Sequence, residues 1–358
     1  MRLVPVDAVR GLTIAAMVLV NNPGTWNAIY PPLRHAAWHG LTPTDLVFPF
    51  FLLIVGLAIP LSLDGRPPLF ALVRVVRRAV VIFALGLVLN AVPAFDWTTI
   101  RIPGVLQRIA VCYLVAAVVY LLTGWRGQSL VAVALLLGYW GAMTLVAVPG
   151  YGAGDLGPEG NLAAYVDRLV LGPHHLWRVS RVYDPEGILS TIPAVATVVF
   201  GMLAGRWLLS HHPPRTITMG LLLAGAFGLG LGAEWGNWFP VNKALWTSSY
   251  AVLTAGIALL VLAACYWAIE VCQWRHWARP FVILGENALT VYFLSTLTAQ
   301  LLVYVRVGEL TVKQLVFQRA FAPWASPVNA SLAYAMAYVI GWWCVTALLS
   351  RTGIRLRA

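Results

Sequence analysis

Two histidines and an aspartate stand close together in one short polar segment of the sequence. His35 and His39 are four residues apart, and Asp45 follows six residues after the second histidine. On a helix the two histidines would share one face, as zinc ligands often do, but the segment has no HExxH pattern and no evident third ligand, so we expect no metal site. Neutral histidine is a natural general base near pH 7. The segment therefore favours proton-transfer or acyl-transfer chemistry.

Other polar residues stand at the ends of long apolar stretches, and the alternation of these stretches would bring them to one side of a membrane. Polar groups in or beside a membrane are costly, so they mark function more often than they do in water. Their convergence predicts a polar substrate site on this side, which we call the outer side. The residues are Asn21, Asn22, His35, His39, Asp45, Gln107, Arg108, Asp184, Glu186, Glu234, Asn237, Asn242 and Lys243.

Each of these residues also has a structural interpretation. A carboxylate at Asp45 or Glu186 can stabilise the N-terminus of a helix, and a loop histidine can be solvated or lie at the membrane interface. Arg108 falls inside an apolar stretch, where a bonded partner is almost obligatory, and Asp45 is one candidate for that partner. The substrate-site hypothesis therefore depends on the convergence and not on any single residue.

A smaller polar set lies at the opposite, inner side. Asp7 and Arg10 flank the start of the first apolar stretch, and Glu286 and Asn287 lie near the inner end of the ninth. These residues are open to two interpretations. They can form a structural ion pair and a helix-packing contact, or they can belong to a ligand site.

The elements that must position these residues are apolar stretches of about 20 residues, the length of a membrane-spanning helix. The first stretch lacks a small-residue cleavage site, so we interpret it as a retained helix and not as a signal peptide. The outer loop at about 150–187 begins with a turn-rich run and is too short for a domain of its own. We predict an all-α polytopic membrane protein with one transmembrane domain over residues 1–358. The ten predicted helices cover residues 7–22, 43–63, 70–92, 103–122, 129–149, 188–208, 216–233, 247–268, 280–302 and 330–349.

The composition excludes most other classes of protein. Of the 358 residues, 60% are hydrophobic and 10% are charged, whereas soluble domains carry about 25% charged residues. The mean hydropathy is +0.79. These values argue against a nucleic-acid-binding protein, a secreted disulfide scaffold and a disordered chain. The four cysteines have no paired or metal-like spacing, so we expect no disulfide and no zinc site.

The charges are polarised between the two sides. If the N-terminus is cytoplasmic, fourteen of the 24 Lys and Arg residues fall at the inner side, whereas each of the three short outer loops carries one. This bias follows the positive-inside rule, so we expect both termini in the cytoplasm. Nine of the 13 Asp and Glu residues fall at or near the outer side. The net charge of +11 is thus mainly topological, with a basic patch for an anionic ligand as the alternative.

Seven blocks of the sequence, in this order, resemble the heparan-α-glucosaminide N-acetyltransferase family, the transmembrane acetyltransferases of lysosomes and their bacterial relatives. They extend from about residue 6 to residue 300, and their joint occurrence is more specific than any single block. The blocks are Val9–Leu12, Leu19–Asn22, His35–Phe51, Ile102–Arg108, Tyr183–Gly187, Pro240–Trp246 and, more loosely, Gly285 with Asn287–Leu289.

The resemblance implies that an acetyl group moves from cytoplasmic acetyl-CoA to the amine of a terminal glucosamine on the far side of the membrane. The family's proposed active-site histidine matches His35, and its assisting asparagine matches Asn21. We therefore expect His35 to be the base or the acyl carrier, Asn21 to stabilise the oxyanion, and Asp45 to complete the catalytic group. Direct transfer and a covalent acetyl-histidine both stay open.

The other candidate residues divide between the two substrates. On the basic inner side, Arg10 and Asn287 are expected to bind acetyl-CoA, a co-substrate whose phosphates also suit Arg74, Arg77 and Arg78. On the acidic outer side, the resemblance and the polar map together suggest a sugar site. Its expected residues are Asn22, Trp38, His39, Arg108, Asp184, Glu186, Asn242 and Lys243.

The sequence departs from the family pattern at His39, where asparagine is usual, and at its start, where the first predicted helix begins almost at Met1. We therefore expect a bacterial-type member in the inner membrane that acetylates a cell-wall or other amino sugar or glycan. Expected partners are the lipid bilayer and these small molecules, with no nucleic acid, and a homodimer stays open. The alternative function is a secondary transporter of a sugar or amino sugar, although the sequence shows no internal repeat of the kind that transporters often have.

Overall fold

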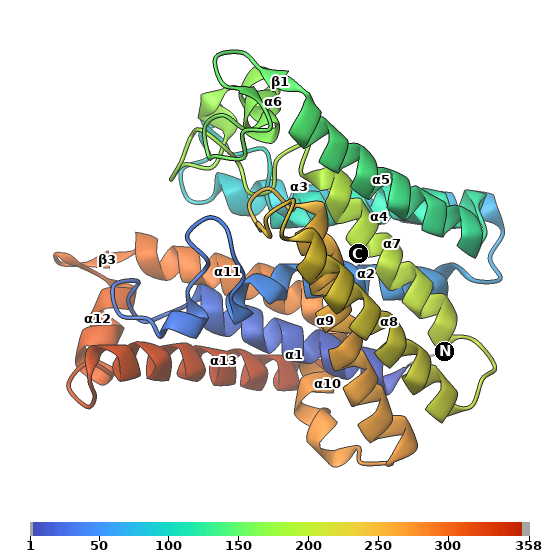
Figure 1. Cartoon of the computed structure of the whole chain (residues 1–358). Helices are drawn as coiled ribbons and strands as arrows, with labels where there is room; N and C mark the ends of the chain where they lie inside the picture. The colour runs from blue at the N-terminus through green and yellow to red at the C-terminus, as the bar shows by residue number, and fades with distance from the viewer. Residues whose placement is uncertain (1–2, 353–358) are drawn as a thin grey trace.

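The computed structural model describes residues 3–352 and is almost entirely helical (Figure 1). Two small antiparallel hairpins, β1–β2 and β3–β4, are the only sheets among the described residues. The helices are α1 (Val4–Asn21), α2 (Val47–Leu63), α3 (Pro68–Ala91), α4 (Val105–Leu122), α5 (Trp125–Leu145), α6 (Leu162–Leu171), α7 (Thr191–Leu208), α8 (Pro214–Trp235), α9 (Ser248–Tyr266), α10 (Arg279–Glu286), α11 (Ala288–Tyr304), α12 (Val312–Ala320) and α13 (Pro327–Thr352). The strands are β1 (Ala147–Val148), β2 (Gly152–Ala153), β3 (Arg306–Val307) and β4 (Leu310–Thr311).

Within residues 3–352, eight helices are long and apolar enough to cross a membrane, or nine if the bent pair α10–α11 counts as one span. Helix α3 has 24 residues, but it carries Arg74, Arg77 and Arg78 near its inner end. Nine of the ten predicted stretches each coincide with one long helix, with ends that differ by a few residues, and the remaining one covers two helices. The all-α polytopic membrane fold is therefore confirmed.

The outward faces of the peripheral helices are apolar, as expected for helices that contact lipid. Large apolar side chains on these faces are exposed, among them Leu137 of α5, Phe227 of α8 and Ile340 of α13. In water such a surface would lead to aggregation, whereas lipid tails cover it at no cost. The exposed faces and the helix lengths together describe an integral membrane protein.

The ninth predicted span, 280–302, is wrong as a single helix. Helices α10 and α11 meet at Asn287 with a bend of 69°. The Asn287 side chain donates to the carbonyl oxygen of Ile283 at 3.0 Å and to the hydroxyl of Ser350 in α13 at 3.1 Å. An asparagine that bonds to nearby backbone offers the chain an alternative to helix, and its second bond to α13 holds the break in place.

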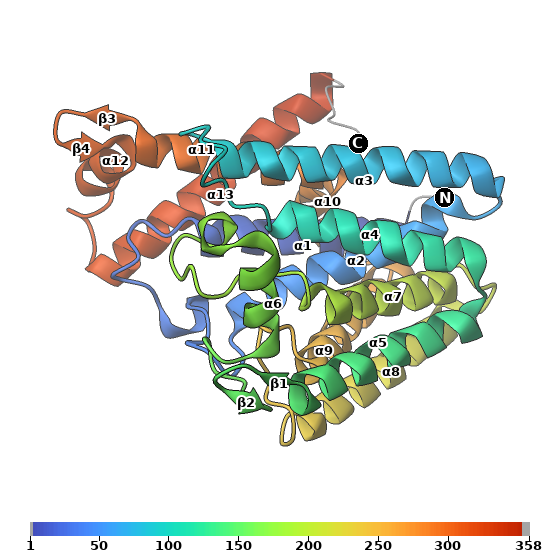
Figure 2. The same cartoon turned by 90° about the horizontal axis from the view of Figure 1, so that it is seen from above.

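The loops divide between two ends of the bundle (Figure 2). At the left of that view lie the first long loop, the segment with α6 and β1–β2, and the segment with β3–β4 and α12. In β1–β2, Ala147 pairs with Ala153, and in β3–β4, Arg306 pairs with Thr311. These are the segments that the sequence placed on the outer side.

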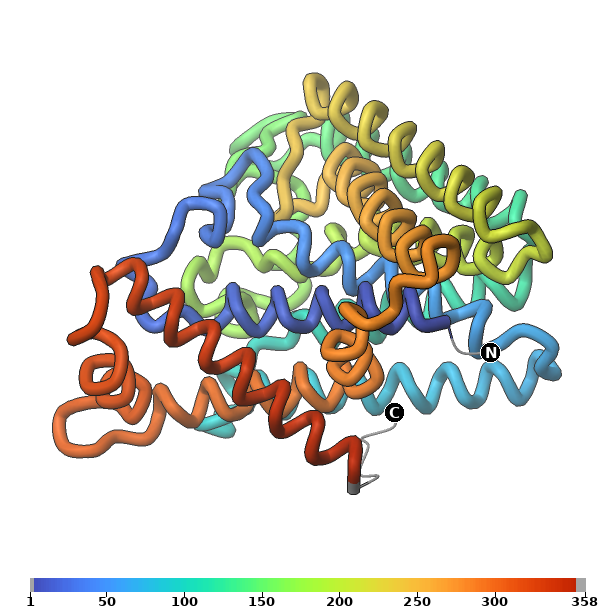
Figure 3. Tube along the Cα trace, turned by 90° about the horizontal axis from the view of Figure 1, so that it is seen from below, coloured from blue at the N-terminus to red at the C-terminus, as the bar shows by residue number. Residues whose placement is uncertain are grey.

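Both described ends of the chain lie at the opposite end of the bundle, which Figure 3 shows from below. Ser350 contacts Asn287, and the backbone of Gly285 packs against that of Asp7 at the start of α1. Three cations that the sequence assigned to the inner side, Arg2, Arg355 and Arg357, lie outside the described residues.

Glycines bring several pairs of helices into backbone contact, among them α2 with α7 and α1 with α10. Between α2 and α7, a methyl group on Gly56 would lie 2.0 Å from the carbonyl oxygen of Val198. Between α1 and α10, a methyl group on Gly285 would lie 2.0 Å from the carbonyl oxygen of Asp7. Small residues allow membrane helices to approach this closely. These two helix pairs flank the cavities described next.

Candidate active site

A cavity of about 370 Å³ opens at the outer end of the bundle. We call it the outer cavity. Its walls come from α1, α2, α4 and α11, and from the loops that follow α1, α3, α6 and α8. Six of the predicted site residues line it: Asn21, His35, Trp38, Asp45, Glu186 and Lys243.

His35 and Asp45 form a hydrogen-bonded pair in this cavity. The Nδ1 atom of His35 lies 2.6 Å from Oδ1 of Asp45. The histidine side chain is 46% exposed, whereas the aspartate side chain is 1% exposed. A proton on Nδ1 bonds to the carboxylate and leaves Nε2 as an acceptor, which is the tautomer that a general base needs.

The Asp45 carboxylate is held rigidly by its local structure. Pro43–Leu46 forms a short 3-10 helix before α2, in which Thr42 and Asp45 make a capping box. Oδ2 of Asp45 accepts from the backbone N–H groups of Ala36 at 3.0 Å and Thr42 at 3.1 Å, and the Thr42 hydroxyl lies 2.9 Å away. The Tyr250 hydroxyl donates to the Asp45 carbonyl at 2.6 Å. The aspartate therefore both caps its helix and orients His35.

Lys243 places a cation beside this pair. Its Nζ lies 3.5 Å from Oδ1 of Asp45 and 3.0 Å from Nδ1 of His35. The shorter His35–Asp45 contact takes the Nδ1 proton, so we assign the ammonium to the carboxylate. Burial lowers the pKa of Lys243, against the opposing effects of Asp45 and Glu186. The carboxylate is thus shared by an imidazole and a lysine.

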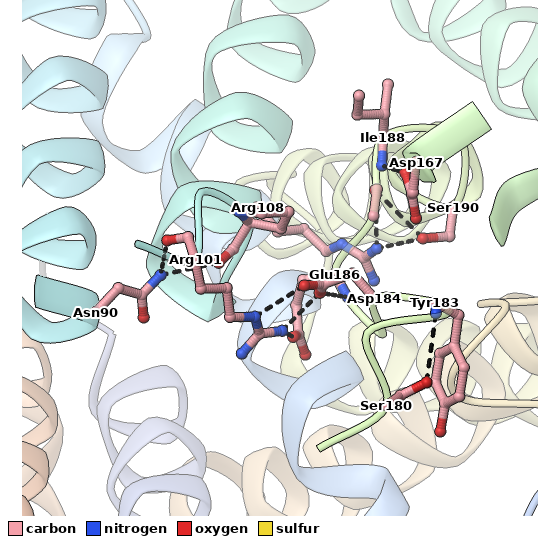
Figure 4. Close-up of polar contacts among 12 residues, drawn as sticks. Asn90, Arg101, Arg108, Asp167, Ser180, Tyr183, Asp184, Glu186, Ile188 and Ser190 are labelled. Carbon is pink, nitrogen blue, oxygen red and sulfur yellow. Dashed lines mark hydrogen bonds and ion pairs between the residues drawn. The ribbon is translucent and has the colours of Figure 1, made fainter. Parts of the chain in front are cut away.

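Two arginines, one just before α4 and one within it, hold the turn at Tyr183–Gly187, as Figure 4 shows. Arg101 donates to both oxygens of Asp184, at 2.8 and 2.5 Å, and to Glu186. Burial alone would lower the pKa of Arg101, but Glu186 and Asp184 outweigh it and raise the pKa above its usual value. Asp184 is buried and does not line the cavity, whereas Glu186 reaches it.

Arg108 of α4 contacts the same turn. Its Nη2 donates to the carbonyl oxygen of Gly187 at 3.2 Å and to the Ser190 hydroxyl, and its guanidinium lies 5.2 Å from the centroid of the Trp246 ring. Nε and Nη1 have no hydrogen-bond partner among the described residues. Pairing with Asp45, which the sequence left open for this arginine, does not occur, because the 3-10 helix Pro43–Leu46 directs that carboxylate to His35 and Lys243.

Asp167 of α6 lies under this turn and was not singled out from the sequence. It is 1% exposed and accepts from the backbone N–H of Ile188 at 2.8 Å. Burial raises its pKa to about 6, and the negative charge of Asp184 adds to the effect. A carboxyl group that titrates near neutral pH therefore lies behind the wall of the outer cavity.

The remaining outer candidates surround the cavity without lining it. Asn22 donates to the Val18 carbonyl at 2.8 Å, and fully buried Asn242 accepts from the Leu245 N–H at 2.9 Å. The Asn242 side chain also lies 3.3 Å from Nδ1 of His39, whose pKa is lowered by burial. These residues shape the loops that carry the lining residues.

An aromatic pair forms one wall of the outer cavity. The rings of Trp38 and Tyr183 meet edge to face with centroids 4.9 Å apart, and the Trp38 indole donates to the Leu156 carbonyl at 2.9 Å. Both residues line the cavity, together with Trp177. Sequence reasoning missed Arg101, Trp177 and the pairing role of Tyr183. Arg101 was detectable, since it directly precedes the Ile102–Arg108 block and is the single cation of its short loop.

A second cavity of about 490 Å³ lies toward the opposite end of the bundle, and we call it the inner cavity. Arg10 and Asn287 line it, as do Arg74 and Arg78. Arg10 pairs with Asp7 at 3.0 Å. The polar residues at the break between α10 and α11 thus face the same space as three arginines. Arg77 is not among the lining residues.

Helices α1, α2, α4 and α11 line both cavities. Along α1, Arg10 lines the inner cavity and Asn21 the outer one, about 16 Å apart at 1.5 Å per residue. In the described part of the chain, His, Cys, Asp and Glu side chains form no group of three that could hold a metal ion. The inner cavity is thus lined by three arginines, and the outer cavity by a histidine–aspartate pair.

Comparison with known proteins identifies the family of the chain. The family model described as heparan-alpha-glucosaminide N-acetyltransferase, catalytic, matches residues 2–227. Human heparan-alpha-glucosaminide N-acetyltransferase is 32% identical over 352 residues, which cover 81% of this chain and 52% of the human protein. The mouse protein of the same name is 30% identical, with 81% and 53% covered. This chain thus spans about half the length of these relatives. The chain belongs to the heparan-alpha-glucosaminide N-acetyltransferase family.

Proposed function

We propose that this protein is a transmembrane N-acetyltransferase that moves an acetyl group from acetyl-CoA to the amine of a glucosamine-type sugar. Acetyl-CoA enters the inner cavity, and the sugar binds in the outer cavity. The observation that carries this proposal is that two cavities, both lined by α1, α2, α4 and α11, hold three arginines at the inner end and a histidine–aspartate pair at the outer end. Family membership supplies the reaction class.

The inner cavity suits the phosphates of CoA. Arg74 and Arg78 add two positive charges to a wall where Arg10 is already paired with Asp7. The N-terminus of α11 adds the positive end of its helix dipole at the same wall. The positive-inside distribution of arginines supports a cytoplasmic position for this end, which is where acetyl-CoA is made available to an inner-membrane enzyme.

The outer cavity suits an amino sugar. Glu186 reaches the cavity while paired with Arg101, so it can accept bonds from hydroxyl groups without carrying an uncompensated charge. The Trp38 and Tyr183 rings offer apolar faces for the sugar ring. Lys243 disfavours binding of a second cation at His35, which selects the neutral amine that the reaction requires.

His35 acts as the base in direct transfer. The sugar amine attacks the thioester carbonyl, and Nε2 of His35 takes one proton from the nitrogen as the C–N bond forms. The C–S bond then breaks, and His35 returns the proton to the leaving sulfur, which gives the amide and CoA thiol. Asp45 stabilises the imidazolium that exists between these two steps.

Asn21 is placed to assist the carbonyl oxygen. Its exposed side chain lines the outer cavity at the C-terminal end of α1 and makes no hydrogen bond within the described residues. An amide N–H that is free in this position can donate to the oxygen that becomes negative in the tetrahedral intermediate.

The test uses the purified full chain in proteoliposomes, with labelled acetyl-CoA on one side and glucosamine on the other. His35→Ala should lower the rate of acetyl transfer about 100-fold to 10,000-fold, the range for a general base. His39→Ala is the matched control, because His39 does not line the cavity, and it should keep most of the activity. Full activity in His35→Ala would disprove the assigned role.

Two further outcomes of this assay distinguish the alternatives. A labelled protein trapped before sugar is added would show a covalent acetyl-enzyme in place of direct transfer. Accumulation of unmodified sugar in vesicles without acetyl-CoA would show a transporter instead of an enzyme. The donor assignment is checked separately by Arg74→Gln and Arg78→Gln, which should raise KM for acetyl-CoA and leave KM for glucosamine unchanged.

A further inference from the structure

The outer and inner cavities have two side chains in common. Phe51 of α2 and Tyr292 of α11 are the residues that line both. The two spaces therefore meet at these two rings, which belong to different helices.

The neighbours of each ring show that the rings mark the boundary. On α2, Val47 and Phe48 line the outer cavity, whereas Ile54 and Val55 line the inner one. Phe51 is one helical turn from both groups.

The same change of side occurs on α11. Ala288 and Leu289 line the inner cavity, and Tyr292, one turn further along, is the first residue of this helix to reach the outer cavity. Phe51 and Tyr292 are both partly exposed, although they lie in the middle of the bundle. The Tyr292 hydroxyl has no hydrogen bond within the described residues. Both rings thus face open space and are not locked into the core by polar contacts.

We propose that Phe51 and Tyr292 form a constriction between the two cavities and that this constriction determines the length of the acyl group that the enzyme transfers. The inference rests on the proposed function, because it requires a thioester that enters from the inner cavity. The acyl group is at the end of the CoA arm and passes first through the gap between the rings. An acyl group that is too large for this gap does not reach His35.

The physical basis is steric. A pocket discriminates against one extra methylene group by about 10-fold to 200-fold. Butyryl-CoA has two more methylene groups than acetyl-CoA, so the parent enzyme should prefer acetyl-CoA by about 100-fold or more in kcat/KM. Removing either ring opens the gap and should weaken this preference.

The first experiment measures kcat/KM for acetyl-, propionyl- and butyryl-CoA with the full chain. Phe51→Ala and Tyr292→Ala should each lower the preference for acetyl-CoA over butyryl-CoA at least 10-fold. Tyr292→Phe keeps the ring and should keep the preference.

The controls are Phe50→Ala and Phe293→Ala, which remove rings from the adjacent positions of α2 and α11. Phe50 and Phe293 pack against hydrophobic clusters and line neither cavity. These variants should keep the parent preference even if they are less stable. An unchanged preference in both constriction variants, or an equal loss in the controls, would overturn the proposal.

The second experiment does not depend on catalysis. Cys272 and Cys344, the two exposed cysteines, are replaced with serine, and Ala37, which lines the outer cavity, is replaced with cysteine. A membrane-impermeant thiol reagent applied at the outer side should label Ala37→Cys in every background. The same reagent at the inner side should label it only when Phe51→Ala and Tyr292→Ala are combined.

The two experiments separate the two proposals. Selective labelling in a protein that transfers no acetyl group would keep the constriction and reject the enzymatic function. Labelling of Ala37→Cys from the inner side in the parent background would reject the constriction, whatever the enzymatic activity.

Discussion

Replacing Asp45 with asparagine should change which nitrogen of His35 carries the proton. In the parent, Oδ2 of Asp45 accepts from the backbone N–H groups of Ala36 and Thr42, while Oδ1 faces Nδ1 of His35. The single oxygen of asparagine must stay with the two backbone donors. Its NH₂ group then faces Nδ1 and donates to it, so the proton of the imidazole moves to Nε2. A protonated Nε2 cannot accept a proton from the sugar amine.

The size of the effect follows from the bonds that a rotated amide would lose. Turning the asparagine to restore the original imidazole tautomer would leave the two backbone N–H groups without an acceptor. Each such buried donor costs about 1–3 kcal/mol, which gives about 2–6 kcal/mol for both. At 1.36 kcal/mol for each factor of ten, kcat should fall by at least about 30-fold. The cap of the 3-10 helix is kept, but Lys243 loses its carboxylate partner at 3.5 Å, so Tm should fall and is measured beside kcat.

The assay is acetyl transfer at saturating acetyl-CoA, with Asp96→Asn as the control. Asp96 is an exposed aspartate in another outer loop that bonds to Thr98 and Thr99, and its replacement should leave kcat unchanged. The ¹⁵N chemical shifts of His35 report its tautomer directly. Parent-like kcat in Asp45→Asn would refute the reasoning. A low kcat in an Asp45→Asn protein whose His35 still carries its proton on Nδ1 would also refute it.

Three further predictions concern the surrounding structure. Arg101→Met leaves two buried carboxylates without their cation, so it should lower the free energy of unfolding by about 3–5 kcal/mol, seen as a lower Tm in detergent. Asp167→Asn should stabilise the protein at pH 7 by up to about 3 kcal/mol, from two pKa units at 1.36 kcal/mol each, and the gain should vanish near pH 4. Gly285→Ala adds a methyl group 2.0 Å from a carbonyl oxygen of α1, so it should lower Tm and weaken acetyl-CoA binding.

The sign for Asp167 follows from its raised pKa. The pKa is about 6 in the folded protein and about 4 in the unfolded chain, so folding favours the protonated form. Its favourable contribution is complete below about pH 4 and is lost as the pH rises through 6. A Tm difference between parent and variant that does not change from pH 4 to pH 7 would contradict this account.

The other two predictions have their own controls. Asp96→Asn removes an exposed charge from the loop that also carries Arg101, and it should leave Tm nearly unchanged. Gly141→Ala adds a methyl group to open space on α5, where alanine favours helix over glycine, so Tm should stay equal or rise. Equal Tm for Gly285→Ala and Gly141→Ala would show that the close contact between α1 and α10 does not contribute to stability.

The helices were predictable because a membrane imposes its thickness on the sequence. Apolar stretches of about 20 residues, separated by arginines and prolines, locate the spans even where α3 carries three arginines near its inner end. The break at Asn287 was not predictable in this way. It depends on a hydrogen bond to Ser350, 63 residues further along the chain, and hydropathy does not report such contacts.

The candidate site was predictable to a similar extent. His35 and Asp45 are ten residues apart, so their pairing was within reach of local reasoning, and the resemblance pointed to the same segment. Arg101 and Asp184 are 83 residues apart, and only the packing of the outer loops brings them together. Phe51 and Tyr292 lie at the same level between the two cavities because of how deep α2 and α11 are set relative to each other. This relative depth cannot be predicted from the two residues or their neighbours in the sequence.

The glycine contacts in the two helix pairs limit how far these helices can move relative to each other. Backbone touches backbone between α2 and α7 and between α1 and α10, so no compressible side-chain layer separates the members of either pair. Phe51 belongs to the first pair, and Tyr292 continues from the second through the bend at Asn287. We therefore expect α2 and α10 to keep their positions under strain, so the constriction proposed at Phe51 and Tyr292 should widen little when a larger acyl group enters.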